Sequence, residues 1–224
     1  MLIIPLVLHL IYIGSAVASI FLTGDAENSL WLLGGCVCCL VHGFFFALRD
    51  LVDNEDDEML KVEKVSQGIV EIVPLGCVNV FFFLQTETVK DFAFAHLFAA
   101  TVVVYNTVAI YGQDERNGTT EYLKSLTIAI FCISLMICGF FANKLFVMVI
   151  GLVALLIKDG AILLDALCIP GTEFVIYIGE SALLAFTGAV AGGYLDDFEV
   201  DIQKLVGYGG GGEKKDEGGD GGGA

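Results

Sequence analysis

Seven polar side chains of this 224-residue chain lie inside long apolar segments, and their chemical groups could bind ions or transfer protons there. Six are ionisable and one is an amide: His9, His42, Glu71, Asn106, Lys158, Asp159 and Glu180. An ionisable group inside hydrocarbon costs about 2.5 to 3.5 kcal/mol on insertion scales unless it finds a partner or water. Carboxylates and imidazoles in this position could relay protons or hold a divalent cation, and a lysine could be the counter-charge that a proton or substrate displaces.

These seven residues are expected at one level of the molecule. Counted from the expected ends of their segments at about 1.5 Å per residue, the six ionisable groups lie roughly 8 to 14 Å below the side of Met1, here called side A. Asn106 lies near the same level, whereas His96 and Asn79 lie elsewhere. The clustering predicts a shared polar network or cavity that opens toward side A, and we call these seven residues the polar layer.

Lys158 is expected to pair with a carboxylate on a neighbouring segment. Lys158 and Asp165 are seven residues apart and share a helix face, whereas Asp159 points about 100° away. Glu180 is the preferred partner and Glu71 the second choice. The competing interpretation is that the long stem of Lys158 carries its ammonium group to the lipid headgroups.

Composition places these residues in a membrane protein. Hydrophobic residues make up 56% of the chain and charged residues 17%, and the mean hydropathy is +0.79. The formal net charge of −16, from 27 acidic and 11 basic residues, excludes the basic surface typical of nucleic-acid binding. Nearly all seven cysteines fall in apolar runs, where a thiol packs as a small hydrophobic group, so no disulfide framework is predicted.

Apolar segments of about 18 or more residues predict membrane-spanning helices. The sequence has seven such segments, at residues 2–23, 29–48, 66–85, 91–112, 125–142, 144–167 and 173–195. The predicted fold is therefore an all-α, polytopic integral membrane protein, with a seven-helix transmembrane domain over residues 1–195. Residues 196–224 form an acidic and then Gly-rich tail, in which residues 209–224 have the composition of a flexible segment.

Most connections between these segments are short, which predicts antiparallel neighbours. Two are longer: residues 49–65 contain an acidic run at 53–58, and residues 113–124 contain the glycosylation sequon Asn117-Gly118-Thr119. The acidic run is not an EF-hand, because Glu58 stands where the turn needs Gly. Basic residues are equally frequent in the loops on both sides, so they do not orient the chain in the membrane.

Two constant shifts along the sequence suggest an internal repeat. A shift of 117 residues brings Gly34 onto Gly151 and His42 onto Asp159, and a shift of 109 brings Glu71 onto Glu180. This pattern predicts two units of three helices joined by the fourth helix, a recurring transporter design. The competing interpretation is coincidence, because apolar sequences align easily.

The expected function is a channel or transporter for a small cation or a proton-coupled solute that passes through the polar layer. The alternative is a non-catalytic structural subunit of a large membrane complex. Enzyme activity is not the favoured expectation: His9 and His42 could ligate a haem, or a zinc ion together with a Glu, but no HExxH spacing occurs. No cofactor is predicted. The expected partners are the bilayer and either further copies of the chain or other subunits, and not nucleic acid.

Overall fold

Every regular element in the described part of the chain is a helix. The computed structural model describes residues 3–52, 57–112, 118–166, 172–198, 200–205 and 207. The helices are α1 (Ile3–Thr23), α2 (Ser29–Val52), α3 (Asp57–Leu84), η1 (Lys90–Phe98), α4 (Ala99–Tyr111), α5 (Gly118–Ala142), α6 (Leu145–Ala166), α7 (Thr172–Ala191), η2 (Asp196–Phe198) and α8 (Ile202–Leu205). The Gly-rich tail, most of the acidic run at 53–58, Asn117 and the side chain of Asp159 lie outside the described residues.

Five helices are long and apolar enough to cross a membrane: Ile3–Thr23, Ser29–Leu51, Glu58–Leu84, Lys90–Tyr111 and Thr119–Ala142. Two further apolar helical segments, Leu145–Lys158 in α6 and Ile176–Ala191 in α7, are shorter within the described residues. Large apolar side chains point outward from these helices, and Phe21, Val41 and Val108 are 77%, 64% and 65% exposed. Such surfaces are rare on monomeric soluble proteins and are compatible with a multi-pass membrane protein.

Two helices begin earlier than hydropathy predicts. α3 begins at Asp57 rather than at residue 66, and α5 begins at Gly118 rather than at residue 125. Hydropathy marks only the apolar part of a helix, whereas the first turns of α3 are charged and contain a Lys61–Glu58 ion pair of 2.7 Å at i,i+3 spacing. The expected fourth helix is also divided, because its first half, η1, is a 3₁₀ helix.

The short connections expected between the first two segments, at residues 24–28, and between the fifth and sixth, at residue 143, are present. Gly24, Asn28 and Asn143 all have positive φ angles, of 55°, 64° and 54°. Glycine and asparagine are the residues that adopt this left-handed conformation most easily. They let the chain reverse direction within a few residues, so α1 lies antiparallel to α2 and α5 antiparallel to α6.

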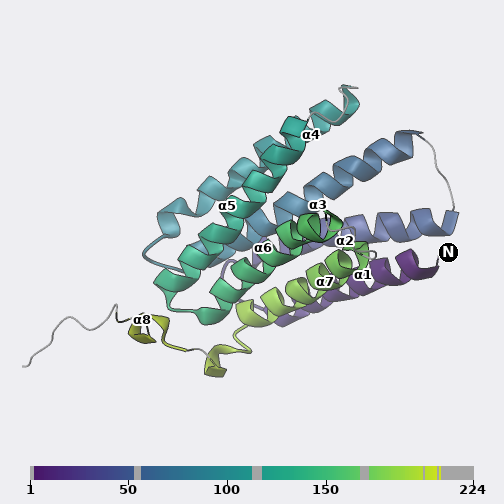
Figure 1. Ribbon diagram of the computed structural model, residues 1–224. Helices are drawn as coiled ribbons and strands as arrows, with labels where there is room; N and C mark the ends of the chain where they lie inside the picture. The colour runs from purple at the N-terminus through teal and green to yellow at the C-terminus, as the bar shows by residue number, and fades with distance from the viewer. Residues whose placement is uncertain are drawn as a thin grey trace, which may run out of the picture.

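Six helices follow one another in a ring, and α4 lies outside it (Figure 1). Around the ring α1 contacts α2, α2 contacts α3, α3 contacts α5, α5 contacts α6, α6 contacts α7, and α7 returns to α1. α4 packs against α3 and α5. In Figure 1 the helices converge near the α5–α6 turn and spread toward the opposite end, where α1 begins. That opposite end is side A, and we call the end with the α5–α6 turn side B.

Close packing inside the ring depends on apolar and small residues. Phe81 of α3 and Phe131 and Leu135 of α5 have no exposed surface. At the α1–α7 contact, a Cβ atom on Gly188 would lie 2.6 Å from the Cα atom of Ser19, a distance that real Cβ atoms do not reach. Gly188 and Gly192, which meets the backbone of Leu22, therefore allow a close approach of α1 and the end of α7.

Candidate functional site

An ion pair joins α6 and α7 within the polar layer. The ammonium group of Lys158 contacts the Oε1 atom of Glu180, and the two side chains are only 16% and 10% exposed. Glu180 is the partner predicted from the sequence, so this pairing is confirmed. Because neither charge is well solvated, each depends on the other for compensation.

A second ion pair joins α3 and α5. The Nζ atom of Lys124 lies 2.8 Å from Oε2 of Glu71 and 2.9 Å from Oε2 of Glu121. The amide of Gln67 donates a hydrogen bond of 2.9 Å to the other oxygen of Glu71. Glu71 also interacts electrostatically with Lys158, so the two ion pairs form one network across α3, α5, α6 and α7.

His42 of α2 is buried beside α3. Its Nδ1 atom lies 2.9 Å from the hydroxyl oxygen of Ser66, and which of the two groups donates depends on the imidazole tautomer. The ring centroid lies 4.5 Å from that of Phe46 and 6.2 Å from that of Tyr12. His42 interacts electrostatically with both Glu71 and Lys158. The imidazole is therefore coupled to the charge network.

His9 of α1 lies beside the end of α2. Its Nε2 atom is 3.5 Å from Oδ2 of Asp50, and the two side chains are 6% and 13% exposed. The ring also packs against Phe46 and, edge to face, against Tyr177 of α7. Among the described residues, Nδ1 of His9 and Oδ2 of Asp50 make no hydrogen bond. An imidazole and a carboxylate with unused polar atoms in a buried contact can accept a proton.

Several charged or polar members of this region were missed by sequence reasoning. They are Arg49, Asp50, Glu63, Ser66, Gln67 and Lys124. Arg49 forms an ion pair with Glu63 of α3 and also lies over the ring of Phe46, 5.8 Å from its centroid. Arg49 and Asp50 were assigned to a loop because α2 ends at Val52 rather than at residue 48, and Glu63 and Lys124 because α3 and α5 begin earlier than expected. The charged residues at 57–65 have the spacing of a helix. That spacing could have placed Glu63 in α3 instead of in a loop.

Asn106, the amide of the polar layer, is buried where α4 meets α3. A Cβ atom on Gly68 would lie 2.3 Å from its Nδ2 atom, so any larger residue at that point of α3 would displace the Asn106 side chain. His96 and Asn79 have backbone partners: Nδ1 of His96 lies 3.0 Å from the oxygen of Ala93, and Asn79 donates to the oxygens of Leu75 in its own helix and Phe131 of α5. These contacts indicate a structural role for both residues.

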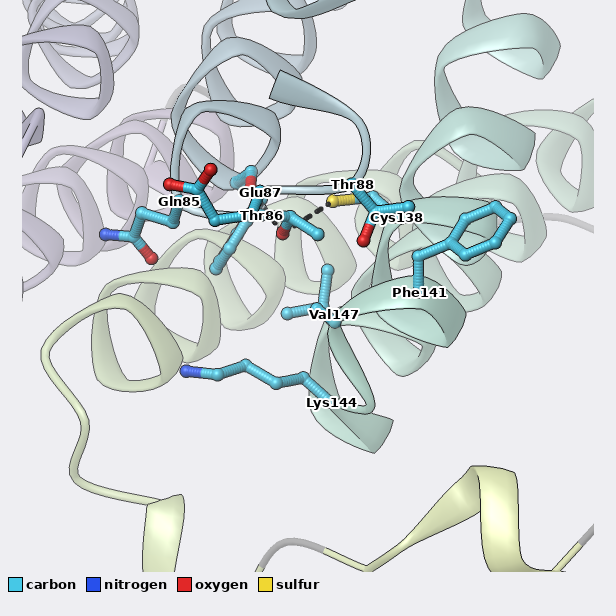
Figure 2. A pocket seen from close by; sticks show the side chains of 10 residues that line it. Gln85, Thr86, Glu87, Thr88, Cys138, Phe141, Lys144 and Val147 are labelled. Carbon is cyan, nitrogen blue, oxygen red and sulfur yellow. Dashed lines mark hydrogen bonds between the residues drawn. The ribbon is translucent and has the colours of Figure 1, made fainter. Parts of the chain in front are cut away.

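A pocket of about 300 Å³ lies at side B, away from the polar layer. The residues that line it are Phe82, Gln85, Thr86, Glu87, Thr88, Cys138, Phe141, Ala142, Lys144 and Val147. Figure 2 shows the polar ends of Gln85, Glu87 and Lys144 extending to the same side, with Phe141 on the other. The cavity expected at side A stays a prediction, because this pocket lies at the opposite end of the helices.

The polar layer and its ion-pair partners bring together carboxylates, ammonium groups and imidazoles from α1, α2, α3, α5, α6 and α7. Within the described residues, no three His, Cys, Asp or Glu side chains are grouped as metal ligands. The cations of Lys124 and Lys158 instead alternate with the carboxylates of Glu71 and Glu180. Such an arrangement can exchange protons or ion-pair partners between neighbouring helices.

The described part of the chain is all-helical, and it contains a network of charged side chains. Five of its helices are long and apolar enough to cross a membrane. Residues 31–191 match the family described as "Domain of unknown function (DUF4791)", and the chain belongs to this family. The match includes six of the seven residues of the polar layer and omits only His9. Comparisons with curated proteins and with solved structures gave no match.

Proposed function

We propose that this chain is a membrane channel or transporter for a small cation or a proton-coupled solute. The ion-pair network of the polar layer is the observation that carries the proposal. Charged residues within spanning helices are costly, and they commonly mark ion pathways and proton relays. Here Lys158–Glu180 and Lys124–Glu71 join four helices that can move relative to one another only if the pairs break or exchange.

The proton-coupled form of the proposal is supported by the two histidines. His9 lies beside Asp50 at the side A end of the network, and His42 interacts electrostatically with Glu71 and Lys158. A proton taken up by His9 or Asp50 would change the charge beside the network. Such a change could favour one arrangement of the helices over another.

The proposal includes seven spans, with α6 and α7 as the sixth and seventh, and a repeat of α1–α3 in α5–α7. The order of neighbours supports the repeat. The contacts of α1 with α2 and of α2 with α3 correspond to those of α5 with α6 and of α6 with α7. The two remaining contacts, α3 with α5 and α7 with α1, then join the two units, and α4 serves as the linker outside the ring.

The test is ion flux in liposomes that contain the purified protein, with proton, sodium and potassium gradients applied separately. Glu180→Gln and Lys158→Met should each abolish flux without preventing membrane insertion, because each removes one partner of the buried pair. Matched controls are Glu27→Gln and Lys204→Met, which make the same changes at exposed positions outside the polar layer. Normal flux in both polar-layer variants would contradict the proposal.

The alternative, a non-catalytic subunit of a membrane complex, is supported by one observation. Lys158 and Glu71 already have partners within the chain, which is what a structural network requires. On this alternative the same two variants would alter only the particle obtained by gentle extraction from the native membrane. A particle of one to four copies of the chain, with flux lost in both variants, would favour transport.

A further inference from the structure

The pocket at side B extends across the ends of the apolar helices. Phe82, Cys138 and Phe141 lie within the candidate spans, which end at Leu84 and Ala142. Glu87, Thr88 and Lys144 lie just beyond these ends. The pocket therefore has an apolar part at the depth of hydrocarbon and a polar part at the depth of lipid headgroups.

The polar part of the pocket carries both signs of charge. Glu87 comes from the connection between α3 and η1, and Lys144 from the α5–α6 turn. In Figure 2 both side chains extend to the same side of the pocket, with Val147 between them. A ligand with one cationic and one anionic group could therefore contact both residues.

The pairs that Glu87 and Lys144 form within the chain are exposed and can be exchanged. Glu87, 86% exposed, pairs with Lys90 at 2.5 Å. Lys144 lies 3.8 Å from Asp196, and those two side chains are 40% and 58% exposed. Exposed pairs of this kind contribute little to stability, so a ligand can displace them easily.

The inner wall of the pocket is made of buried side chains. Phe82 and Val147 are buried, and the thiol of Cys138 lies 3.5 Å from the hydroxyl of Thr86. The pocket of about 300 Å³ is at the lower end of the range of small-ligand sites. It therefore has room for a headgroup and the first part of an acyl chain.

We infer that this pocket binds a phospholipid whose headgroup carries a primary ammonium as well as a phosphate. The ammonium group contacts Glu87, the phosphate contacts Lys144, and the glycerol and upper acyl chain pack against Phe82, Phe141 and Val147. The inference rests on the membrane placement proposed above and is independent of transport.

The test measures lipid retention by native mass spectrometry on the full chain in mild detergent. Ethanolamine, choline and glycerol phospholipids with the same acyl chains are added separately. The ethanolamine lipid should be retained at least about tenfold better than the glycerol lipid, which lacks the ammonium group.

Three variants assign the binding to this pocket. Lys144→Ala and Glu87→Gln should each reduce retention of the ethanolamine lipid, whereas Lys204→Ala and Glu27→Gln at exposed positions outside the pocket should not. Ala142 is half-buried in the pocket wall, so the larger side chain of Ala142→Phe should fill part of the pocket and block binding. Size-exclusion chromatography checks that this variant is folded.

Equal retention of all three lipids, or retention that none of the variants alters, would overturn the inference. Retention of soluble phosphoethanolamine that is as strong as that of the lipid would overturn the assignment to a lipid and identify a site for the free headgroup compound. A variant that loses lipid binding but keeps normal flux, or one that keeps lipid binding but loses flux, shows that the two proposals stand or fail separately.

Discussion

Lys124 shares its ammonium group between two carboxylates that differ in burial. Glu71 lies 2.8 Å away and is 17% exposed, whereas Glu121 lies 2.9 Å away and is 48% exposed. Removing one partner of a buried pair leaves an uncompensated charge, whereas an exposed pair contributes little. At the residue scale, burial rather than distance therefore decides which carboxylate stabilises the structure.

We expect Glu71→Gln to destabilise the protein by up to about 3 kcal/mol and Glu121→Gln by less than about 1 kcal/mol. The two variants remove the same chemical group from the same partner, so each controls for the other. Apparent melting temperatures in one detergent, followed by circular dichroism, measure the difference. Equal melting temperatures for both variants would mean that the buried charge of Lys124 needs no internal partner.

At the scale of the elements, glycines set the distance between α1 and α7. A Cβ atom on Gly188 would meet the Cα atom of Ser19 at 2.6 Å, so a side chain there would force the helix backbones apart. Gly34 of α2 is also within a helix, but a Cβ atom there would meet nothing within 4 Å. Alanine substitutions at these two positions therefore separate the effect of close packing from the effect of helix propensity.

Gly188→Ala should destabilise the protein by about 1 to 3 kcal/mol, the usual cost of overpacking. Gly34→Ala should be neutral or stabilising by up to about 1 kcal/mol, because alanine favours the helix over glycine. Thermal unfolding of the two variants beside the parent protein tests this. If both substitutions had the same effect, the close α1–α7 contact would not limit stability.

At the scale of the whole molecule, the number of spans decides on which side the connection between α6 and α7 lies. With seven spans, an epitope inserted between Ala166 and Thr172 lies on the same side of the membrane as the N-terminus. If only the five long apolar helices cross, the epitope lies on the opposite side. Protease protection of this epitope in sealed vesicles, compared with an N-terminal tag, should show the same side for both.

The order of the helices also explains why the sequence predicted one ion pair and missed the other. Lys158 and Glu180 lie on consecutive helices at matching depth, so spacing along the chain was sufficient to predict their contact. Glu71 meets Lys124 because α5 packs beside α3 while α4, which comes between them in the sequence, lies outside the ring. The late start expected for α5 also placed Lys124 in a loop.

The sequence by itself determined the helical class, five of the long apolar helices and the pairing of Lys158 with Glu180. These properties depend on composition and on counting along single helices, which a linear sequence records. Only the tertiary structure decided that Glu71 pairs with Lys124, that Asp50 lies beside His9 and that a pocket forms at side B. Such contacts depend on which helices are neighbours and on the rotation of each about its axis, and both are set by side-chain packing across the whole bundle.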